Sequence, residues 1–479
     1  MLIYDTEKRG DKPLYEFLYD CIKKDIHAGV LKSGDRLPSR RQMAMDNGIA
    51  EITVANAYSQ LVTEGYITSR EKRGYFVAMD LEAITYDSTF TVPEGKKVDV
   101  QAFDEKCPCQ DMAKKPGVNL TDGSLPEEAF PFDTWSKLAR RVLTENRAEC
   151  IKTPEARGLQ ALREAIAGYL ERARGFSPNP EHIIVGPGSG YLSNVLLSLL
   201  GPDAMVAVED PGYMCICKIY EFSGHKCLHI PVDENGLITD GLSGSNIKMI
   251  HVSPSHHFPM GCVMSAPRRA ALCSWAEETG AWIVEDDYDS EFRFEGRPVP
   301  PVVASNPGRV IYMNTFTRTL SPSLRIAYMI LPDELYEKYS GRLDFSSGTV
   351  STSEQLTLAS FISEGYYERH LNRTRNFYKK RKKAIFEEME NSGLSDYFSC
   401  EGDGSGMTFI LRAKRKMNEK KFMDYLRRYG WSLNSLQEYC YNNRVFSPAG
   451  FVVNFGSLSE EQFAQAARVM CDALRKRNV

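Results

Sequence analysis

Between residues 13 and 79, apolar positions recur first at helical spacing and then in short alternating runs. A first helix carries the apolar residues Leu14, Phe17, Leu18, Cys21 and Ile22 and ends before Gly29. Ser39 and Gln42 stand at capping-box spacing at the start of a second helix. A third helix places Val54, Ala57, Tyr58 and Leu61 on one face, and two strands follow at Tyr66–Ser69 and Tyr75–Val77. This order predicts an α+β winged helix-turn-helix.

From Val118 onward, short apolar runs alternate with helical stretches. The predicted strands are Ile183–Val185, Met205–Val208, Lys248–Val252, Ala281–Val284, Val310–Met313 and Ala327–Leu331. Such alternation predicts an α/β domain with a mostly parallel sheet covered on both faces. We therefore divide the chain into a winged helix at 1–79, a linker at 80–117 and a large domain at 118–479. Within the large domain, a smaller subdomain is expected from about residue 346.

Length and charge limit the possible functions. The 479 residues are too many for one ordinary core, and the net charge of −4 gives no global attraction to nucleic acid, so a DNA-binding surface must be local. There is no apolar signal core and no apolar run near the ~20 residues that cross a bilayer. Twelve thinly spread cysteines fit reduced thiols in the cytoplasm, and their spacing predicts no metal site.

The candidate DNA-binding residues lie in three groups of the first domain. Thr53 and Asn56 on the third helix are placed to read base edges in a major groove. Ser39, Arg40 and Arg41 at the start of the second helix are suited to phosphate. The wing adds Arg70, Lys72, Arg73 and Gly74. From the pattern alone, a helical module that binds protein stays open.

The first domain resembles the GntR-type winged helix. The resemblance is carried by Gly34-Asp35-Arg36-Leu37-Pro38-Ser39-Arg40-Arg41, by Leu61-Val62-Thr63-Glu64-Gly65-Tyr66-Ile67 and by Arg73-Gly74-Tyr75-Phe76-Val77. It implies binding to double-stranded operator DNA. One departure is Ala50-Glu51, where the family usually has Ser-Arg or a similar pair, and an acidic residue there repels phosphate.

Several motifs of the large domain follow predicted strands. Gly186-Pro187-Gly188-Ser189-Gly190 precedes a helix, whose free N–H groups suit a phosphate. Tyr213 is suited to stack on a flat ring, and a carboxylate in Glu285-Asp286-Asp287-Tyr288-Asp289 is suited to pair with a protonated ring nitrogen. The stretch from Thr315 to Arg325 supplies hydroxyl and guanidinium groups. Each motif alone also fits a capped turn or a surface patch.

Together, and in this order, these motifs resemble the fold-type I aminotransferases, and more narrowly the MocR-type regulators, which fuse a GntR-type domain to that fold. The resemblance implies a site for pyridoxal phosphate (PLP) or pyridoxamine phosphate. The implied contacts are Ser189, Gly190, Thr315, Thr317 and Arg325 with the phosphate, Tyr213 over the ring, Asp286 at the ring nitrogen and Tyr288 at the ring hydroxyl. It also implies a head-to-tail homodimer.

The pattern breaks at Arg318, which stands where the family has its Schiff-base lysine. A guanidinium stays charged and is essentially not nucleophilic, so it cannot form the covalent bond. Cys215 and Val452 or Val453 stand where relatives have arginines, and Thr153-Pro154 replaces a Tyr-Gly pair.

We therefore expect a transcription regulator with no catalytic residue. Its large domain would sense a small-molecule effector and mediate dimerisation, and any cofactor would be held without a covalent bond, with Arg318 adding a phosphate contact. Two alternatives stay open for the pocket, another ligand or a role as a scaffold only. The alternative for the whole chain is an active PLP-dependent aminotransferase with a vestigial DNA-binding domain.

Overall fold

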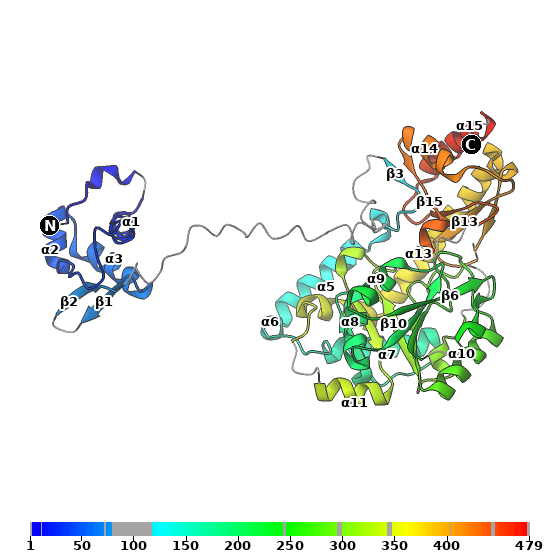
Figure 1. The fold of residues 1–479 in the computed structure, drawn as a ribbon, viewed down its shortest axis with the longest axis horizontal. Helices are drawn as coiled ribbons and strands as arrows, with labels where there is room; N and C mark the ends of the chain where they lie inside the picture. The colour runs from blue at the N-terminus through cyan, green and yellow to red at the C-terminus, as the bar shows by residue number, and fades with distance from the viewer. Residues whose placement is uncertain are drawn as a thin grey trace. The chain divides into compact units, whose positions relative to one another are not determined.

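The computed structural model describes residues 2–10, 12–70, 73–78, 117–242, 246–294, 299–342, 347–402, 404–441 and 446–476. The chain separates into two compact units, Met1–Glu105 and Lys106–Val479, and each is considered by itself. Apart from Gly117, the linker predicted at 80–117 lies outside the described residues. Figure 1 shows the elements of both units.

The first unit is the predicted winged helix. Its elements are α1 (Leu14–His27), α2 (Arg40–Asn47), α3 (Glu51–Thr63), β1 (Ile67–Arg70) and β2 (Gly74–Val77). Ser39 caps α2, since its side chain accepts from the Gln42 backbone N–H at 3.2 Å, although the Gln42 side chain turns instead to Asp46. Gly48, in the left-handed region, ends α2. The strands form an antiparallel hairpin.

The core of this unit lies where the helical period predicted it. Ile22, Val54, Tyr58 and Leu61 are fully buried, and α1 packs on α3. The Tyr58 hydroxyl donates to the Pro38 carbonyl at 3.0 Å, which ties α3 to the start of α2. The orientation of the exposed face of α3 therefore depends on this small core.

The second unit is built on an eight-stranded sheet. Its helices are α5 (Phe132–Glu145), α6 (Arg147–Cys150), α7 (Gln160–Arg174), α8 (Ser189–Leu200), α9 (Met214–Phe222), α10 (Ala266–Thr279), α11 (Asp333–Arg342) and α12 (Thr352–Ser363). Its strands are β4 (Ile183–Gly186), β5 (Met205–Asp210), β6 (Cys227–Asp233), β7 (Gly236–Leu237), β8 (Ile247–Val252), β9 (Trp282–Asp286), β10 (Val310–Thr315) and β11 (Ala327–Ile330). The strand order is β4-β11-β10-β9-β8-β5-β6-β7.

The central strands β10, β9, β8, β5 and β6 are parallel, as the alternating pattern predicted. Helices cover both faces, because successive side chains of a strand point to opposite sides. In β4, for example, Ile183 and Val185 pack in the core on one face of the sheet, together with residues of α7, α10 and α12. Ile184 packs in the core on the other face, together with residues of α8, α9 and α11.

A smaller subdomain has its own sheet and core. Its elements are β3 (Val118–Asn119), α13 (Tyr366–Ser392), β12 (Phe398–Glu401), β13 (Thr408–Ala413), α14 (Glu419–Arg428), β14 (Trp431–Ser432), β15 (Asn434–Ser435), β16 (Gly450–Asn454) and α15 (Glu460–Arg475). The expected start near residue 346 is too early, because α12 still packs on α7 and α5 in the large core. The core of the smaller subdomain consists of Leu120, Phe292 and residues from Tyr378 onward. The segment after the linker thus returns to this subdomain.

Truncating the buried Leu61 to alanine is expected to destabilise the first unit by about 2–5 kcal/mol, since it removes a fully buried side chain and leaves a cavity. Hydrogen exchange measured on the full-length protein should become faster in peptides from α1 and α3. Val62→Ala is the matched control, because Val62 is 37% exposed. Unchanged exchange in Leu61→Ala would contradict this packing.

Candidate cofactor pocket and DNA-binding surface

A cavity of about 310 Å³ lies at the carboxyl ends of the parallel strands. This is where open α/β sheets bind their ligands. Its walls come from the loops and helix starts that follow β4, β5, β8, β9 and β10. They comprise Gly188, Ser189, Gly190, Tyr213, Ile216, Ile219, Ser253, Phe258, Asp286, Tyr288, Thr315, Thr317, Arg318 and Arg325. All nine residues predicted to meet the cofactor are among them.

One end of the cavity is shaped for an anion. Gly188 is the N-cap of α8, and a Cβ added there would lie 2.7 Å from Arg325 Nη2. Only glycine therefore allows the guanidinium to approach the helix start, whose free N–H groups favour negative charge. Arg325 itself has φ 51°, the only positive φ of a non-glycine residue in the described part of the chain. The backbone holds this strained conformation where the side chain meets the loop.

Two hydroxyls complete the anion-binding end. Thr315 Oγ1 and Thr317 Oγ1 lie 2.8 Å apart, and Thr315 Oγ1 accepts from the Thr317 backbone N–H at 3.1 Å. Thr315 is the last residue of β10, so the strand register places its hydroxyl beside the neighbouring strand end. Hydroxyls, a guanidinium and helix-start N–H groups form a donor set that fits a phosphate ester.

The opposite end holds a buried hydrogen-bonded chain. Asp286, the last residue of β9, has Oδ2 3.4 Å from His251 Nε2, and His251 Nδ1 lies 2.6 Å from the Tyr220 hydroxyl. A neutral His251 that carries its proton on Nε2 donates to Asp286 and accepts from Tyr220. This contact orients the Asp286 carboxyl group at the wall of the cavity, where a carboxylate is suited to pair with a protonated ring nitrogen.

Aromatic side chains flank the space between the two ends. Tyr213, 51% exposed, meets Phe258 edge-to-face with ring centroids 6.2 Å apart. Across the cavity, the Tyr288 hydroxyl lies 3.2 Å from His256 Nδ1, which is also 2.9 Å from Asp289. Burial raises the pKa of Tyr288 well above its ordinary value, so its hydroxyl stays protonated and able to donate.

Arg318 enters the same cavity from the loop after β10. Its Nη1 donates to the Gly123 carbonyl at 2.9 Å, and a side chain on Gly123 would collide with the guanidinium. A backbone carbonyl therefore holds the cation at the wall of the cavity. Its contact with Gly123, which lies just after β3, is one that the sequence did not indicate.

This chain has no arginine at the positions where we expect relatives to carry one, and the residues found there lie in different surroundings. Val452 is fully buried in an apolar cluster with Ile410 and Leu436, beside Phe258. Val453 is buried in the core of the smaller subdomain. Cys215 lies half-buried on α9. A charged side chain at either valine position would have to be desolvated in an apolar core.

A buried carboxyl group lies beneath the cavity. Glu209 Oε2 accepts from the Ser253 backbone N–H at 3.0 Å and lies 3.6 Å from His257 Nε2. Burial raises the pKa of Glu209 to about 8, and the nearby Asp286 carboxylate adds to this. Burial also lowers the pKa of His257 to about 3. Both side chains are therefore largely uncharged at neutral pH.

In the first unit, most of the predicted DNA-binding residues are exposed. These are Ser39, Arg40, Arg41, Asn56, Arg70 and Arg73, while Thr53 and Gly74 are half-buried. The Arg70 guanidinium lies over the Phe76 ring, 4.7 Å from its centroid. This contact holds the Arg70 side chain of β1 against strand β2. Lys72 lies outside the described residues.

The structure corrects the predicted surface of α3. Ile52 is 68% exposed at the first turn, whereas Thr53, which we expected to read base edges, is half-buried. Met45 on α2 is 70% exposed. Sequence reasoning missed Ile52 and Met45 because it assigns apolar side chains to the core. An exposed apolar side chain on a helix of this kind is, however, suited to contact a thymine methyl group.

Comparison with known families accounts for both units. Residues 14–77 match the family of bacterial regulatory proteins of the gntR type, whose helix-turn-helix domains bind DNA. Residues 115–468 match the family of class I and II aminotransferases, a PLP-dependent fold family. One similar protein is the probable rhizopine catabolism regulatory protein MocR of Rhizobium meliloti, 34% identical, over 88% of this chain and 85% of that one. The chain belongs to the MocR-type transcription regulators.

Other relatives of this MocR-type regulator are similar over most of their length. The HTH-type transcriptional regulator YdeL of Bacillus subtilis is 34% identical over 88% of both chains. The pyridoxine biosynthesis regulator PdxR of Corynebacterium glutamicum is 32% identical over 77% of both chains. The protein is accordingly a DNA-binding transcription regulator with an aminotransferase-like domain.

Solved structures establish the fold of the second unit. The kynurenine aminotransferase of Pyrococcus horikoshii, solved with PMP, superposes with a TM-score of 0.67 at 21% identity and covers 78% of this chain and 96% of that one. A multiple-substrate aminotransferase of Thermococcus profundus gives 0.67 at 24% identity, over 82% and 99%. The fold-type I architecture is thus confirmed. Among the described helices of this regulator, none is long and apolar enough to span a bilayer.

Glu209→Gln is expected to reduce the loss of stability that accompanies rising pH. Folded Glu209 keeps its proton between its ordinary pKa of 4.5 and about 8, whereas the unfolded chain has released it. Raising the pH through this window therefore favours the unfolded state, by up to about 1.4 kcal/mol for each pH unit. The amide of the variant still accepts from Ser253 but does not ionise.

Thermal unfolding of cofactor-free protein between pH 5 and 8 measures the effect. The exposed Glu337→Gln on α11 is the matched control, which should follow the wild type. Parallel pH profiles for wild type and Glu209→Gln would show that this carboxyl is not buried as described.

Proposed function

We propose that the second unit is a non-catalytic sensor that binds PLP or pyridoxamine phosphate without a covalent bond and transmits its occupancy to the DNA-binding unit. The observation that carries the proposal is Arg318 inside a cavity whose other walls suit the cofactor. A guanidinium is charged and essentially not nucleophilic at physiological pH. The fixed contact with Gly123 further limits its motion.

The residues present fit the cofactor. Arg325, Thr315, Thr317 and the start of α8 would hold the phosphate, and Asp286 would pair with the ring nitrogen. Tyr213 would cover the ring, Tyr288 would donate to its hydroxyl, and Arg318 would add a cationic contact. When bound, PLP supplies an electron-withdrawing ring and an aldehyde, and catalysis by the fold needs a lysine amine beside them. Position 318 offers instead a donor of hydrogen bonds.

A second function, an active aminotransferase, is compatible with the intact Asp286–His251–Tyr220 chain. That chain serves ring binding in a sensor as well as in an enzyme, so it does not decide between them. The positions Val452 and Val453 favour the sensor, because an amino-acid substrate loses its usual arginine partner there.

Regulation requires that the effector distinguish two states of the protein. A ligand shifts an equilibrium only by its difference in affinity for the two states. We propose a homodimer, head-to-tail as in its relatives, in which two winged helices meet two half-sites in the cytoplasm and pocket occupancy selects their arrangement. A small-molecule effector that enters beside Tyr213 would supply the difference in affinity.

Asp286→Asn is expected to weaken PLP binding about 10- to 100-fold, because it removes a charged partner of the ring nitrogen, a hydrogen bond worth about 1.5–3 kcal/mol. Equilibrium dialysis of PLP against the purified full-length protein gives the affinity. Asp333→Asn is the control, since that side chain is 93% exposed at the start of α11. Equal affinity in wild type and Asp286→Asn would contradict the assigned ring site.

Arg41→Ala and Arg73→Ala are each expected to weaken binding to the DNA upstream of the chain's own gene. Each change removes one phosphate contact, so the slope of log affinity against log salt should become shallower by about 1. Gel shifts over a salt series measure it, with Arg342→Ala, an exposed arginine on α11, as the control. An equal loss in Arg342→Ala would contradict the assignment to the winged helix.

A further inference from the structure

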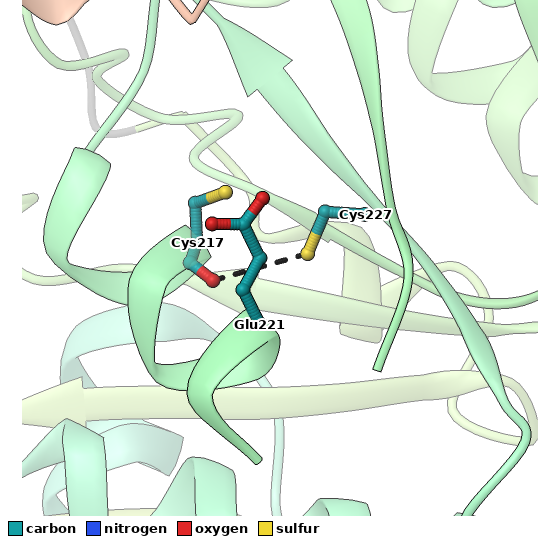
Figure 2. Close-up of side chains that lie close together, drawn as sticks. All are labelled: Cys217, Glu221 and Cys227. Carbon is teal, nitrogen blue, oxygen red and sulfur yellow. Dashed lines mark hydrogen bonds between the residues drawn. The ribbon is translucent and has the colours of Figure 1, made fainter. Parts of the chain in front are cut away.

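Two cysteines and a glutamate converge beside the cofactor cavity. Cys217 and Glu221 stand one turn apart on α9, and Cys227 is the first residue of β6, the next strand along the chain. One ligand atom from each residue lies within 4.8 Å of the other two. Figure 2 shows the Glu221 carboxylate turned toward Cys217, with Cys227 facing the helix from the strand.

From this geometry we propose that Cys217, Glu221 and Cys227 bind a thiophilic d¹⁰ cation, with Zn²⁺ as the natural candidate. Two thiolates and one carboxylate oxygen are ligands that zinc prefers, and three protein ligands leave a fourth position for water. Zinc–sulfur bonds of about 2.3 Å in a tetrahedron place the sulfurs about 3.8 Å apart. A zinc–oxygen bond of about 2.0 Å places the carboxylate oxygen about 3.5 Å from each sulfur, so closing the present spacing of at most 4.8 Å needs a shift of about 1.3 Å or less. The site does not depend on the function proposed above.

A neighbouring imidazole supports the thiolate at Cys217. His229 Nε2 lies 3.9 Å from Cys217 Sγ, and the ring is stacked on Tyr441 with centroids 3.6 Å apart. A nitrogen held in this way donates to a metal-bound thiolate and orients it, as outer partners of zinc ligands do. Among the described residues, no lysine or arginine forms an ion pair with Glu221, so its charge is available to a cation.

Access and acidity are consistent with reversible binding. Cys217 is buried, while Glu221 and Cys227 are half-buried and reachable from solvent. A cysteine binds zinc as the thiolate, so a thiol that is protonated in the metal-free site must release its proton on binding. Binding then exchanges one Zn²⁺ for the two thiol protons, which are released to water, and affinity must rise with pH.

The position of the site connects it with the pocket. Cys217 and His229 also line a small cavity that Tyr213, His251 and Asp286 border. Tyr213 immediately precedes α9, and Ile216 and Ile219 of that helix line the cofactor cavity. A metal ion that joins α9 to β6 would therefore hold one wall of the pocket in place.

Cobalt titration of the reduced, metal-free and PLP-free full-length protein tests the proposal. We expect one Co²⁺ per chain, with a thiolate-to-cobalt charge-transfer band, displacement by Zn²⁺ and tighter binding at pH 8 than at pH 6.5. Cys217→Ser and Cys227→Ser should each abolish the band. Glu221→Gln, which alters no core side chain, should weaken binding by about 10-fold or more while circular dichroism stays unchanged.

Two control proteins should bind cobalt like the wild type. They are Cys273→Ser, on α10, and the double variant Cys107→Ser/Cys109→Ser, which removes a cysteine pair with the same spacing as Cys215 and Cys217. A wild type with no charge-transfer band, or a band that persists in both Cys217→Ser and Cys227→Ser, would overturn the proposal. A Cys217–Cys227 disulfide in a protein that fails to bind cobalt after reduction would overturn it as well.

Discussion

The permanent positive charge of Arg318 is the constraint on which the behaviour of the second unit depends. Its guanidinium is held by the Gly123 carbonyl in a cavity that Asp286, Arg325 and the α8 start shape for a charged ring and its phosphate. The hydrogen bonds and ion pairs that those groups can offer do not require a covalent link. In the sensor that we propose, a side chain that cannot act as a nucleophile separates cofactor binding from cofactor chemistry.

The register of the central strands is what assembles the pocket. Tyr213 follows β5, Asp286 ends β9 and Thr315 ends β10, and parallel pairing brings these strand ends to one edge of the sheet. The α9 helix then carries one wall of the cavity and, on another side, Cys217 and Glu221. Ligands at both places would act on the same helix, which offers a physical route for coupling them.

Much of this was predictable because the signals are local. Strand periodicity located β4, β5, β8, β9, β10 and β11, and a motif after a strand lies at that strand's end. Other features depend on distant residues. No local pattern in the sequence predicts the hydrogen bond between Arg318 and Gly123 or the packing of Leu120 in the core of the smaller subdomain. The Cys217–Glu221–Cys227 group was missed because its spacing is not that of common zinc motifs, and Ile52 was missed because its exposure breaks the usual assignment of apolar residues.

The most direct test is to treat purified wild-type protein with PLP, then with borohydride, and to measure the mass of the chain after denaturation. The account predicts PLP absorbance before denaturation and an unmodified mass afterwards, because no amine at position 318 is available to be trapped. A chain that carries a reduced pyridoxyl group at a single site in the cavity, together with steady turnover of an amino donor, would contradict it.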